Sequence, residues 1–181
     1  LKYPEGKMRC PVHLSIGQEA IPAALSQLIN KDDFAVSGHR GHAHYLSKGG
    51  DLKAMIAEIY GKATGCSKGK GGSMHLIDLS VNFMGTSAIV GNSIPVGVGL
   101  GLSIQLKNTD QISCVFFGEG AIEEGVFYES INFAALKSLP VLFLCENNLY
   151  SVYSNLSVRQ PQDRNIINMV NSIGVSSSSC D

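Results

Sequence analysis

The sequence contains no tryptophan, and charged residues make up only 16% of its 181 positions. Its formal net charge is −1, so neither sign of charge is in clear excess. Because nucleic acids and anionic membrane surfaces attract proteins with a basic excess, this composition argues against both kinds of partner. Hydrophobic residues make up 44%, enough for one substantial core, and we expect a single domain over 1–181.

Closely spaced cysteine pairs are absent as well. The five cysteines are odd in number, no two of them have CxxC spacing, and Cys114 and Cys145 lie inside apolar runs. This pattern predicts reduced thiols that pack as small hydrophobic residues. Because reduced thiols are typical of intracellular proteins, we expect a cytoplasmic location, or the mitochondrial matrix if the source is eukaryotic.

The first residues, Leu1-Lys2-Tyr3-Pro4, lack the apolar core of a secretion signal. The Gly-rich apolar stretch 89–106 is interrupted by Asn92, Ser93 and Pro95, so no membrane span is expected. The chain begins without Met and ends in a serine run. We therefore expect a fragment of a longer chain, truncated at its C-terminus.

Two helices are predicted in the first third of the chain. Residues 13–29 read as a helix entry followed by an amphipathic helix, with Ser15 and Gln18 in capping-box spacing, although Pro22 favours a late start. Asp51 is expected to cap a second helix, which ends at a glycine and has an apolar face made of Leu52, Met55, Ile56 and Ile59.

Two loops with chemically active residues accompany these helices. A short strand, 34–36, leads into a loop over 37–44 that carries His39, Arg40, His42 and His44. A second loop, 61–74, contains five glycines and three lysines. Because it is longer than most connections in compact domains, we expect a flexible, functional loop.

The second half of the chain predicts the fold class. In 94–106, glycines alternate with aliphatic residues, which is typical of a buried helix packed closely on a sheet. The apolar runs 112–117 and 141–145 have strand length, and 123–137 between them has helical spacing. Strand, helix and strand in this order form a right-handed parallel unit. The sequence thus predicts an α/β fold, a parallel sheet flanked by helices that binds ligands at the carboxyl ends of its strands.

Both of these strands end in a loop with oxygen ligands. The first is followed by Gly118-Glu119-Gly120-Ala121 and the second by Glu146-Asn147-Asn148-Leu149-Tyr150. A carboxylate, a carboxamide oxygen and backbone carbonyls form the ligand set that Mg²⁺ prefers. The small residues let the backbone approach an anion, and the next helix directs its free N–H groups to the same place. We predict Mg²⁺ bridging a diphosphate.

The pair of loops resembles the GDG-to-NN signature of thiamine diphosphate enzymes, with Glu119 in the position of the metal-binding aspartate. The interval from Glu119 to Asn148 is 148 minus 119, or 29 residues, which fits that signature. Four more blocks in the same order resemble alpha subunits of pyruvate, branched-chain 2-oxo acid and acetoin dehydrogenase E1 components: His13–Ala20, Arg40–His42, Gly69–His75 and Ile89–Gly91.

The resemblance implies a thiamine diphosphate-binding fold of the diphosphate-binding type and a role for each matching residue. Glu119, Asn148 and the Tyr150 carbonyl would bind Mg²⁺. His13, His42 and His75 would handle protons or guide substrate, since histidine titrates near neutrality. The cofactor itself would contact His39, Arg40, Ala88, Val90, Gly118, Gly120, Ala121 and Asn148.

The resemblance also implies partners. A beta-type E1 subunit, in an alpha2beta2 heterotetramer, would supply the glutamate that activates the cofactor ring, and a lipoyl-bearing E2 transferase would accept the acyl group. The expected reaction is oxidative decarboxylation of a 2-oxo acid, or the corresponding acetoin reaction, followed by acyl transfer to lipoamide. Which 2-oxo acid is used does not follow from the sequence.

Four other interpretations stay open at this point. His39, His42 and His44 could bind zinc, although a fourth ligand is missing, or could be ordinary loop histidines. A dinucleotide-binding domain would need a complete GxGxxG run after its first strand, which neither glycine cluster supplies. A non-catalytic paralogue would use the fold for assembly or regulation, with Glu119 marking a weakened metal site.

Overall fold

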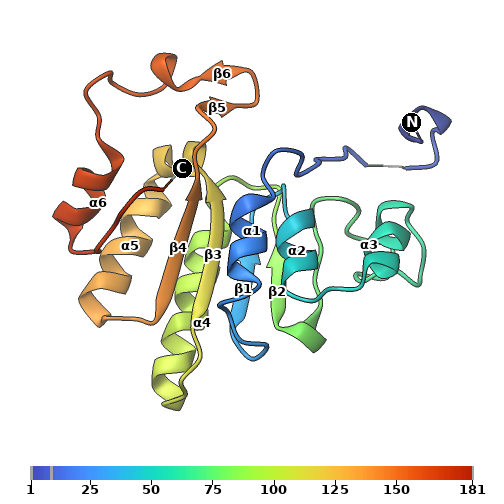
Figure 1. Cartoon of the computed structure of the whole chain (residues 1–181), viewed down its shortest axis with the longest axis horizontal. Coiled ribbons are helices and arrows are strands. Elements are labelled where there is room, and N and C mark those ends of the chain that lie inside the picture. Colours follow the sequence, from blue (N-terminus) through green and yellow to red (C-terminus); the bar gives the residue numbers. More distant parts are fainter. Residues whose placement is uncertain (1, 9, 181) are drawn as a thin grey trace.

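The computed structural model describes residues 2–8 and 10–180 and has a four-stranded parallel sheet at its centre. The strand order is β2-β1-β3-β4, formed by β1 (Phe34–Ser37), β2 (Phe83–Thr86), β3 (Ser113–Gly118) and β4 (Val141–Glu146). Helices flank the sheet, as predicted (Figure 1). The fold class is therefore confirmed, and β3, α5 (Gly125–Lys137) and β4 form the predicted parallel unit.

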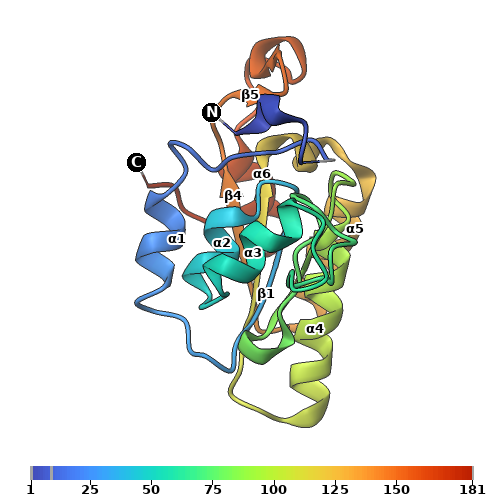
Figure 2. The same cartoon turned by 90° about the vertical axis from the view of Figure 1, so that its right-hand side faces the viewer.

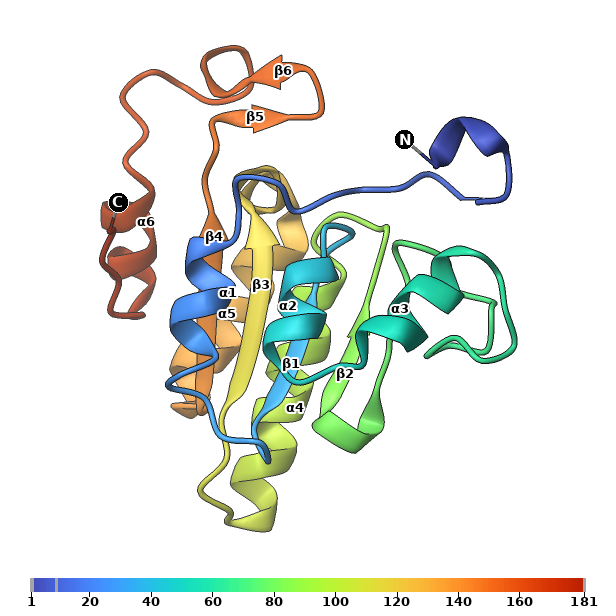
Figure 3. The same cartoon turned by 45° about the vertical axis from the view of Figure 1, so that its right-hand side comes forward.

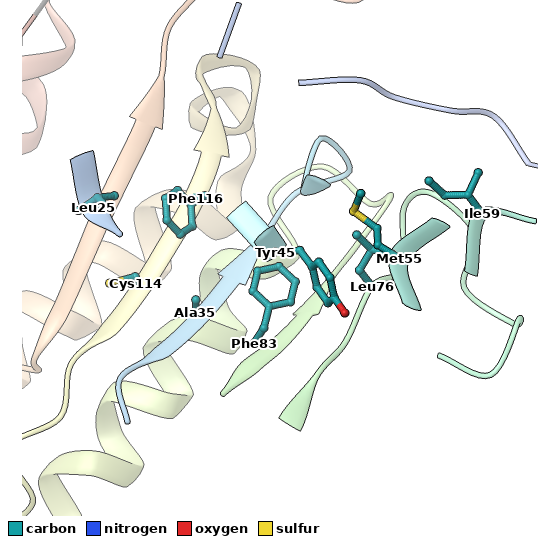
Figure 4. Packing of buried hydrophobic residues seen from close by; sticks show 9 residues of the cluster. All are labelled: Leu25, Ala35, Tyr45, Met55, Ile59, Leu76, Phe83, Cys114 and Phe116. Carbon is teal, nitrogen blue, oxygen red and sulfur yellow. The ribbon is translucent and has the colours of Figure 1, made fainter. Parts of the chain in front are cut away.

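The two faces of the sheet carry different helices (Figure 2). One face packs against α1 (Ala20–Leu25), α2 (His42–Ser47) and α3 (Leu52–Ile59). The side chains on this face are Ala35, Cys114 and Phe116, and they form one hydrophobic cluster with residues of the three helices (Figure 4). Val36, Val115 and Phe117 point the other way, toward α4 (Ser93–Lys107) and α5. This alternation is the period of two expected of a strand covered on both faces.

Helix α4 packs closely on the sheet because glycines face the strands. A Cβ atom on Gly97 would lie 2.2 Å from Val115 Cγ2, and one on Gly101 would lie 2.4 Å from Val141 Cγ2. Gly99, on the same helix, has no atom within 4 Å of the corresponding position. The spacing of small residues in the sequence thus has a packing reason at Gly97 and Gly101.

We expect Gly97→Ala to destabilise the protein by about 1–3 kcal/mol, because overpacking a tight helix–sheet contact forces the backbone to shift. Gly99→Ala is the matched control, and it should leave stability unchanged or raise it by up to about 1 kcal/mol through helix propensity. Urea unfolding of both variants measures the difference. Equal effects of the two substitutions would contradict the packing argument.

Several local predictions need correction. Ser15 caps no helix: α1 begins only at Ala20, and the Ser15 hydroxyl instead donates to the Arg40 carbonyl and accepts from the Ala43 N–H. The predicted loop 37–44 ends early, because α2 begins at His42. Asp51 does cap α3 by accepting from the Ala54 N–H, but two residues of the predicted apolar face, Leu52 and Ile56, are exposed.

The chain after β4 forms elements that the sequence did not predict. A short antiparallel pair, β5 (Tyr150–Ser151) and β6 (Ser154–Asn155), lies at the carboxyl end of the sheet, and α6 (Ile166–Ile173) packs beside α5 (Figure 1). Short 3-10 turns complete the chain: Tyr3–Glu5, Leu79–Val81, Glu119–Glu123 and Leu156–Val158. Within residues 2–8 and 10–180, no helix has the length and apolar character needed to span a membrane.

Candidate functional site

A cavity of about 120 Å³ opens at the carboxyl ends of β1, β3 and β4. An adjoining hollow shares Gln18, Arg40 and Asn148 with it and includes His13. In Figure 3 the N-terminal segment crosses this end of the sheet on its way to α1. The structure therefore has a cavity where a parallel sheet is expected to bind ligands.

Most of the predicted site residues line this cavity. The two predicted ligand loops lie side by side, because Gly118 on β3 pairs with Glu146 on β4 in the parallel ladder. Ala88, His42 and His75 do not line the cavity, and His75 is exposed. The predicted residues that do line it are His39, Arg40, Val90, Gly118, Glu119, Gly120, Ala121, Asn148 and Tyr150.

Two asparagines shape the loop after β4. Asn147 Oδ1 accepts a hydrogen bond from the Leu149 N–H at 3.1 Å, and Asn148 Oδ1 accepts one from the Tyr150 N–H at 3.0 Å. Such contacts are Asx turns, and Leu149 has a positive φ of 67°. A carboxamide oxygen has two lone pairs, so Asn148 Oδ1 retains acceptor capacity for a ligand in the cavity.

Glu119 is a buried carboxylate, 2% exposed, that has a cationic partner. Its Oε1 accepts from Arg159 Nη2 at 2.5 Å, and Arg159 Nη1 also pairs with Glu123. The neighbouring Gly120 allows close packing, because a Cβ atom there would lie 2.9 Å from Ser151 Oγ. Arg159 was not predicted from the sequence, since it lies 40 residues from Glu119 with no local motif around it.

A second buried polar group, formed by His44, Ser37 and Glu146, lines the cavity. His44 Nδ1 lies 2.8 Å from Ser37 Oγ, and His44 Nε2 lies 2.9 Å from Glu146 Oε1. The imidazole stacks on Phe116 with ring centroids 4.0 Å apart.

Burial, together with the charges of Glu119 and Glu146, raises the pKa of the nearby Cys145 thiol to about 12, so this cysteine is no nucleophile near neutral pH.

The histidines at the entrance are held by Ser73. The buried Ser73 hydroxyl accepts from the His13 N–H at 3.1 Å and lies 2.9 Å from His42 Nε2. The rings of His13 and His39 meet edge to face, with centroids 4.8 Å apart. Three segments that are far apart in the sequence therefore converge here. His75 does not join them through its side chain in any contact among the described residues.

These contacts do not support a zinc site. The rings of His42 and His44 bond to different partners, Ser73 and the Ser37–Glu146 pair. Among residues 2–8 and 10–180, no three His, Cys, Asp or Glu side chains gather as a metal-binding group. A divalent cation at the cavity would therefore depend on amide and carbonyl oxygens in addition to a carboxylate.

Burial lowers the pKa of His42 below its ordinary value, with a smaller lowering from the charge of His13. The folded protein thus favours neutral His42, and the unfolded chain takes up the proton more readily. The contribution of neutral His42 to the stability of the fold is complete above about pH 6.5, the usual histidine pKa, and it is lost as the pH falls below that value. We expect acidification from pH 7 to pH 5 to lower the thermal midpoint more in the wild type than in His42→Gln. Parallel curves would contradict this expectation.

The Gly-rich loop 61–74 is fixed around a carboxylate, which corrects the prediction that it is flexible. Glu58 on α3 is fully buried, and its two oxygens accept from the backbone N–H groups of four loop residues. The distances from donor to oxygen are 2.8, 2.8, 2.6 and 3.2 Å for Ser67, Gly69, Gly71 and Gly72, respectively. Glu58 thereby orients the segment that ends in Ser73 and His75.

Comparison with known proteins gives consistent matches. The family model described as "Dehydrogenase E1 component" matches residues 1–171. The pyruvate dehydrogenase E1 component subunit alpha of Rickettsia bellii is 43% identical over 155 residues, covering 86% of this chain and 48% of that protein. The alpha subunit of acetoin:2,6-dichlorophenolindophenol oxidoreductase from Bacillus subtilis is 44% identical over 148 residues, covering 82% and 44%.

The fold also matches solved structures. An X-ray structure described as that of a thiamin diphosphate-dependent enzyme isolated from Mycobacterium smegmatis aligns with a TM-score of 0.55. The alignment covers 91% of this chain and 26% of that chain at 17% identity, a level at which it supports the fold alone. The chain spans about half the length of the curated relatives it matches.

Proposed function

The chain belongs to the dehydrogenase E1 component family, and from this premise we propose that it is the diphosphate-binding part of an alpha subunit that uses thiamine diphosphate and Mg²⁺. The assembled enzyme would act on a 2-oxo acid or on acetoin, the substrates in the names of the relatives, and would transfer the acyl group to lipoamide. When bound, the cofactor supplies the nucleophilic carbon and the electron sink that decarboxylation requires.

One observation carries the proposal. Glu119, Asn148 and Tyr150 come from two separate loops and line one cavity at paired strand ends. Their carboxylate, carboxamide and carbonyl oxygens suit a hard divalent cation.

In the proposed site the chain binds and orients the charged end of the cofactor. Gly118, Gly120 and Ala121 would let backbone N–H groups approach the diphosphate. Arg40 and His39 line the same cavity and would add positive charge or donors. Val90 and Ala88 would contact the cofactor ring through their backbone. His13 and His42 would guide substrate or protons at the entrance, whereas His75 is exposed and lies outside the residues that line the cavity.

The proposal includes a beta-type subunit and a lipoyl-bearing E2 transferase. Large apolar side chains are exposed at the cavity and beside it, as expected of a surface that another subunit covers. They are Ile16, Ile89, Val152 and Tyr153.

The alternative, a non-catalytic paralogue, gains support from the Glu119–Arg159 pair, because the expected metal ligand already has a cation partner. Titrating thiamine diphosphate into the chain mixed with its beta-type subunit, with and without Mg²⁺, separates the two. We expect saturable binding that requires Mg²⁺. Binding that is absent under both conditions would favour the paralogue.

Calorimetry is suited to this experiment, because the chain contains no tryptophan to report binding by fluorescence. NAD⁺ is a useful second titrant, because binding of NAD⁺ in place of thiamine diphosphate would favour a dinucleotide-binding domain.

A further inference from the structure

We propose that Arg159 is a positioning residue of the metal site: its guanidinium holds one carboxylate oxygen of Glu119, so that the other oxygen faces the cavity. This inference rests on the proposed function, because it assumes that Glu119 binds Mg²⁺. It assigns a role to a residue outside the loops that carry the expected ligands.

All three guanidinium nitrogens of Arg159 are engaged. Nε donates to the Ser154 carbonyl at 3.2 Å, Nη1 pairs with Glu123, and Nη2 donates to Glu119 Oε1 at 2.5 Å. The side chain is 12% exposed, and that of Glu119 is 3% exposed. A planar guanidinium fixed at three points loses little further freedom when it orients a carboxylate. The group is therefore preorganised toward Glu119.

The segment that carries Arg159 is itself tied to the same turn. Gln160 Nε2 donates to Glu123 Oε1 at 3.0 Å, and Gln160 is buried. Ser151 packs against Gly120, where any side chain would collide with its hydroxyl. The turn Glu119–Glu123 and the segment 151–160 thus form one packed unit, and a shift of either would move the Glu119 carboxylate.

Arg159 approaches Glu119 from outside the cavity. Glu119 lines the cavity, whereas Arg159 is not among the residues that do so. The guanidinium uses only Oε1, and Oε2 accepts no hydrogen bond among the described residues, so we expect Oε2 to be available to a ligand in the cavity. A carboxylate that accepts a hydrogen bond at one oxygen and binds a cation at the other is a common arrangement, in which the supporting group fixes the ligand's orientation.

The length of Glu119 makes such support necessary. A glutamate has one more rotatable bond than an aspartate, so an unsupported carboxylate would occupy several rotamers. Mg²⁺ requires nearly ideal octahedral geometry and tolerates displaced ligands poorly. Arg159 restricts the additional freedom and would let the longer side chain meet this requirement.

The test is a double-mutant cycle on Mg²⁺ affinity, measured by calorimetry with saturating thiamine diphosphate on the complex with the beta-type subunit. We expect Arg159→Gln to weaken Mg²⁺ binding by about 10–100-fold, the usual cost of removing a residue that orients a metal ligand. In a Glu119→Asp background, we expect the shorter carboxylate to lose its contact with the guanidinium. In that background Arg159→Gln should change Mg²⁺ affinity by no more than about twofold, which is the usual deviation from additivity for two sites that do not interact.

Arg164→Gln is the matched control, because Arg164 is an exposed arginine of the same segment and forms no ion pair among the described residues. It should leave Mg²⁺ affinity unchanged. If Arg159→Gln does not fold, Glu123→Gln loosens the guanidinium while keeping its contact with Glu119, and it should weaken Mg²⁺ binding several-fold, by about 3–10-fold.

The outcomes distinguish this inference from the proposed function. Tighter or unchanged Mg²⁺ binding by Arg159→Gln, with normal binding by the wild type, overturns the positioning role alone. Equal losses in the wild-type and Glu119→Asp backgrounds also overturn it, because they indicate a general structural role. A wild-type complex that binds no Mg²⁺ overturns the proposed function, and this inference with it.

Discussion

Glu119→Gln is expected to weaken Mg²⁺-dependent binding of thiamine diphosphate by about 100-fold or more. Residues that only support a metal ligand commonly contribute 10–100-fold, roughly, to metal affinity, and Glu119 is expected to be a ligand itself. The substitution keeps the size of the side chain and removes its charge. The residue lies on the cavity wall at the end of β3, where no other acidic side chain from that loop lines the cavity among the described residues.

Two further variants make the result specific. Glu119→Asp keeps the carboxylate and should retain measurable Mg²⁺ binding, weaker than the wild type because the contact with Arg159 is lost. Glu129→Gln removes an exposed carboxylate from the following helix, α5, and should have no effect. Wild-type affinity in Glu119→Gln would exclude this residue as a metal ligand.

Glu58→Ala is expected to have the largest effect on stability, about 3–5 kcal/mol, since removing one side of a buried charged contact leaves its partners unsatisfied. Four backbone N–H groups of the loop 61–74 would lose their acceptor. If the loop opens locally, water can hydrogen-bond to these N–H groups, and we expect this to limit the loss of stability. Chemical denaturation measures the total loss of stability. Hydrogen exchange of the Ser67, Gly69, Gly71 and Gly72 amides shows whether that loss is confined to the loop.

Glu58→Gln sharpens this prediction. A carboxamide offers one acceptor oxygen, and its NH₂ group would face two of the four donors, so most of the loss should remain. Unchanged exchange rates in the loop, together with a large global loss of stability, would mean that Glu58 supports the core instead of the loop. The exposed residue Lys53 on the same helix provides a control, and Lys53→Ala should change stability by less than about 0.5 kcal/mol.

Local patterns predicted the central part of the fold well. The apolar runs of β3 and β4, with helical spacing between them, have a period that is visible within a few residues, and parallel pairing then places both of their loops at one edge. The glycines of α4 are informative for the same reason, because the contact they permit recurs every turn. These features depend on neighbours in the sequence.

The features that were missed depend on residues far apart in the chain. Glu58 looks like an ordinary polar position on an amphipathic helix, and only the folded loop reveals that it is buried. Arg159 has no neighbouring pattern that connects it to Glu119. His44 was assigned to a loop with three other basic residues, yet it reaches Glu146 across 102 positions. Such polar pairs have no periodicity, so tertiary contacts alone identify them.

The pairing of Gly118 with Glu146 has a consequence for how this protein can vary. The backbone ladder, and not any loop side chain, sets the gap across which a cation would be held. Replacements within either loop leave that gap intact, whereas inserting one residue into β4 would advance its end by about 3.3 Å and turn Glu146 away from His44. The spacing between the two loops therefore survives substitutions in the loops themselves, but it does not survive changes of length in the strands beneath them.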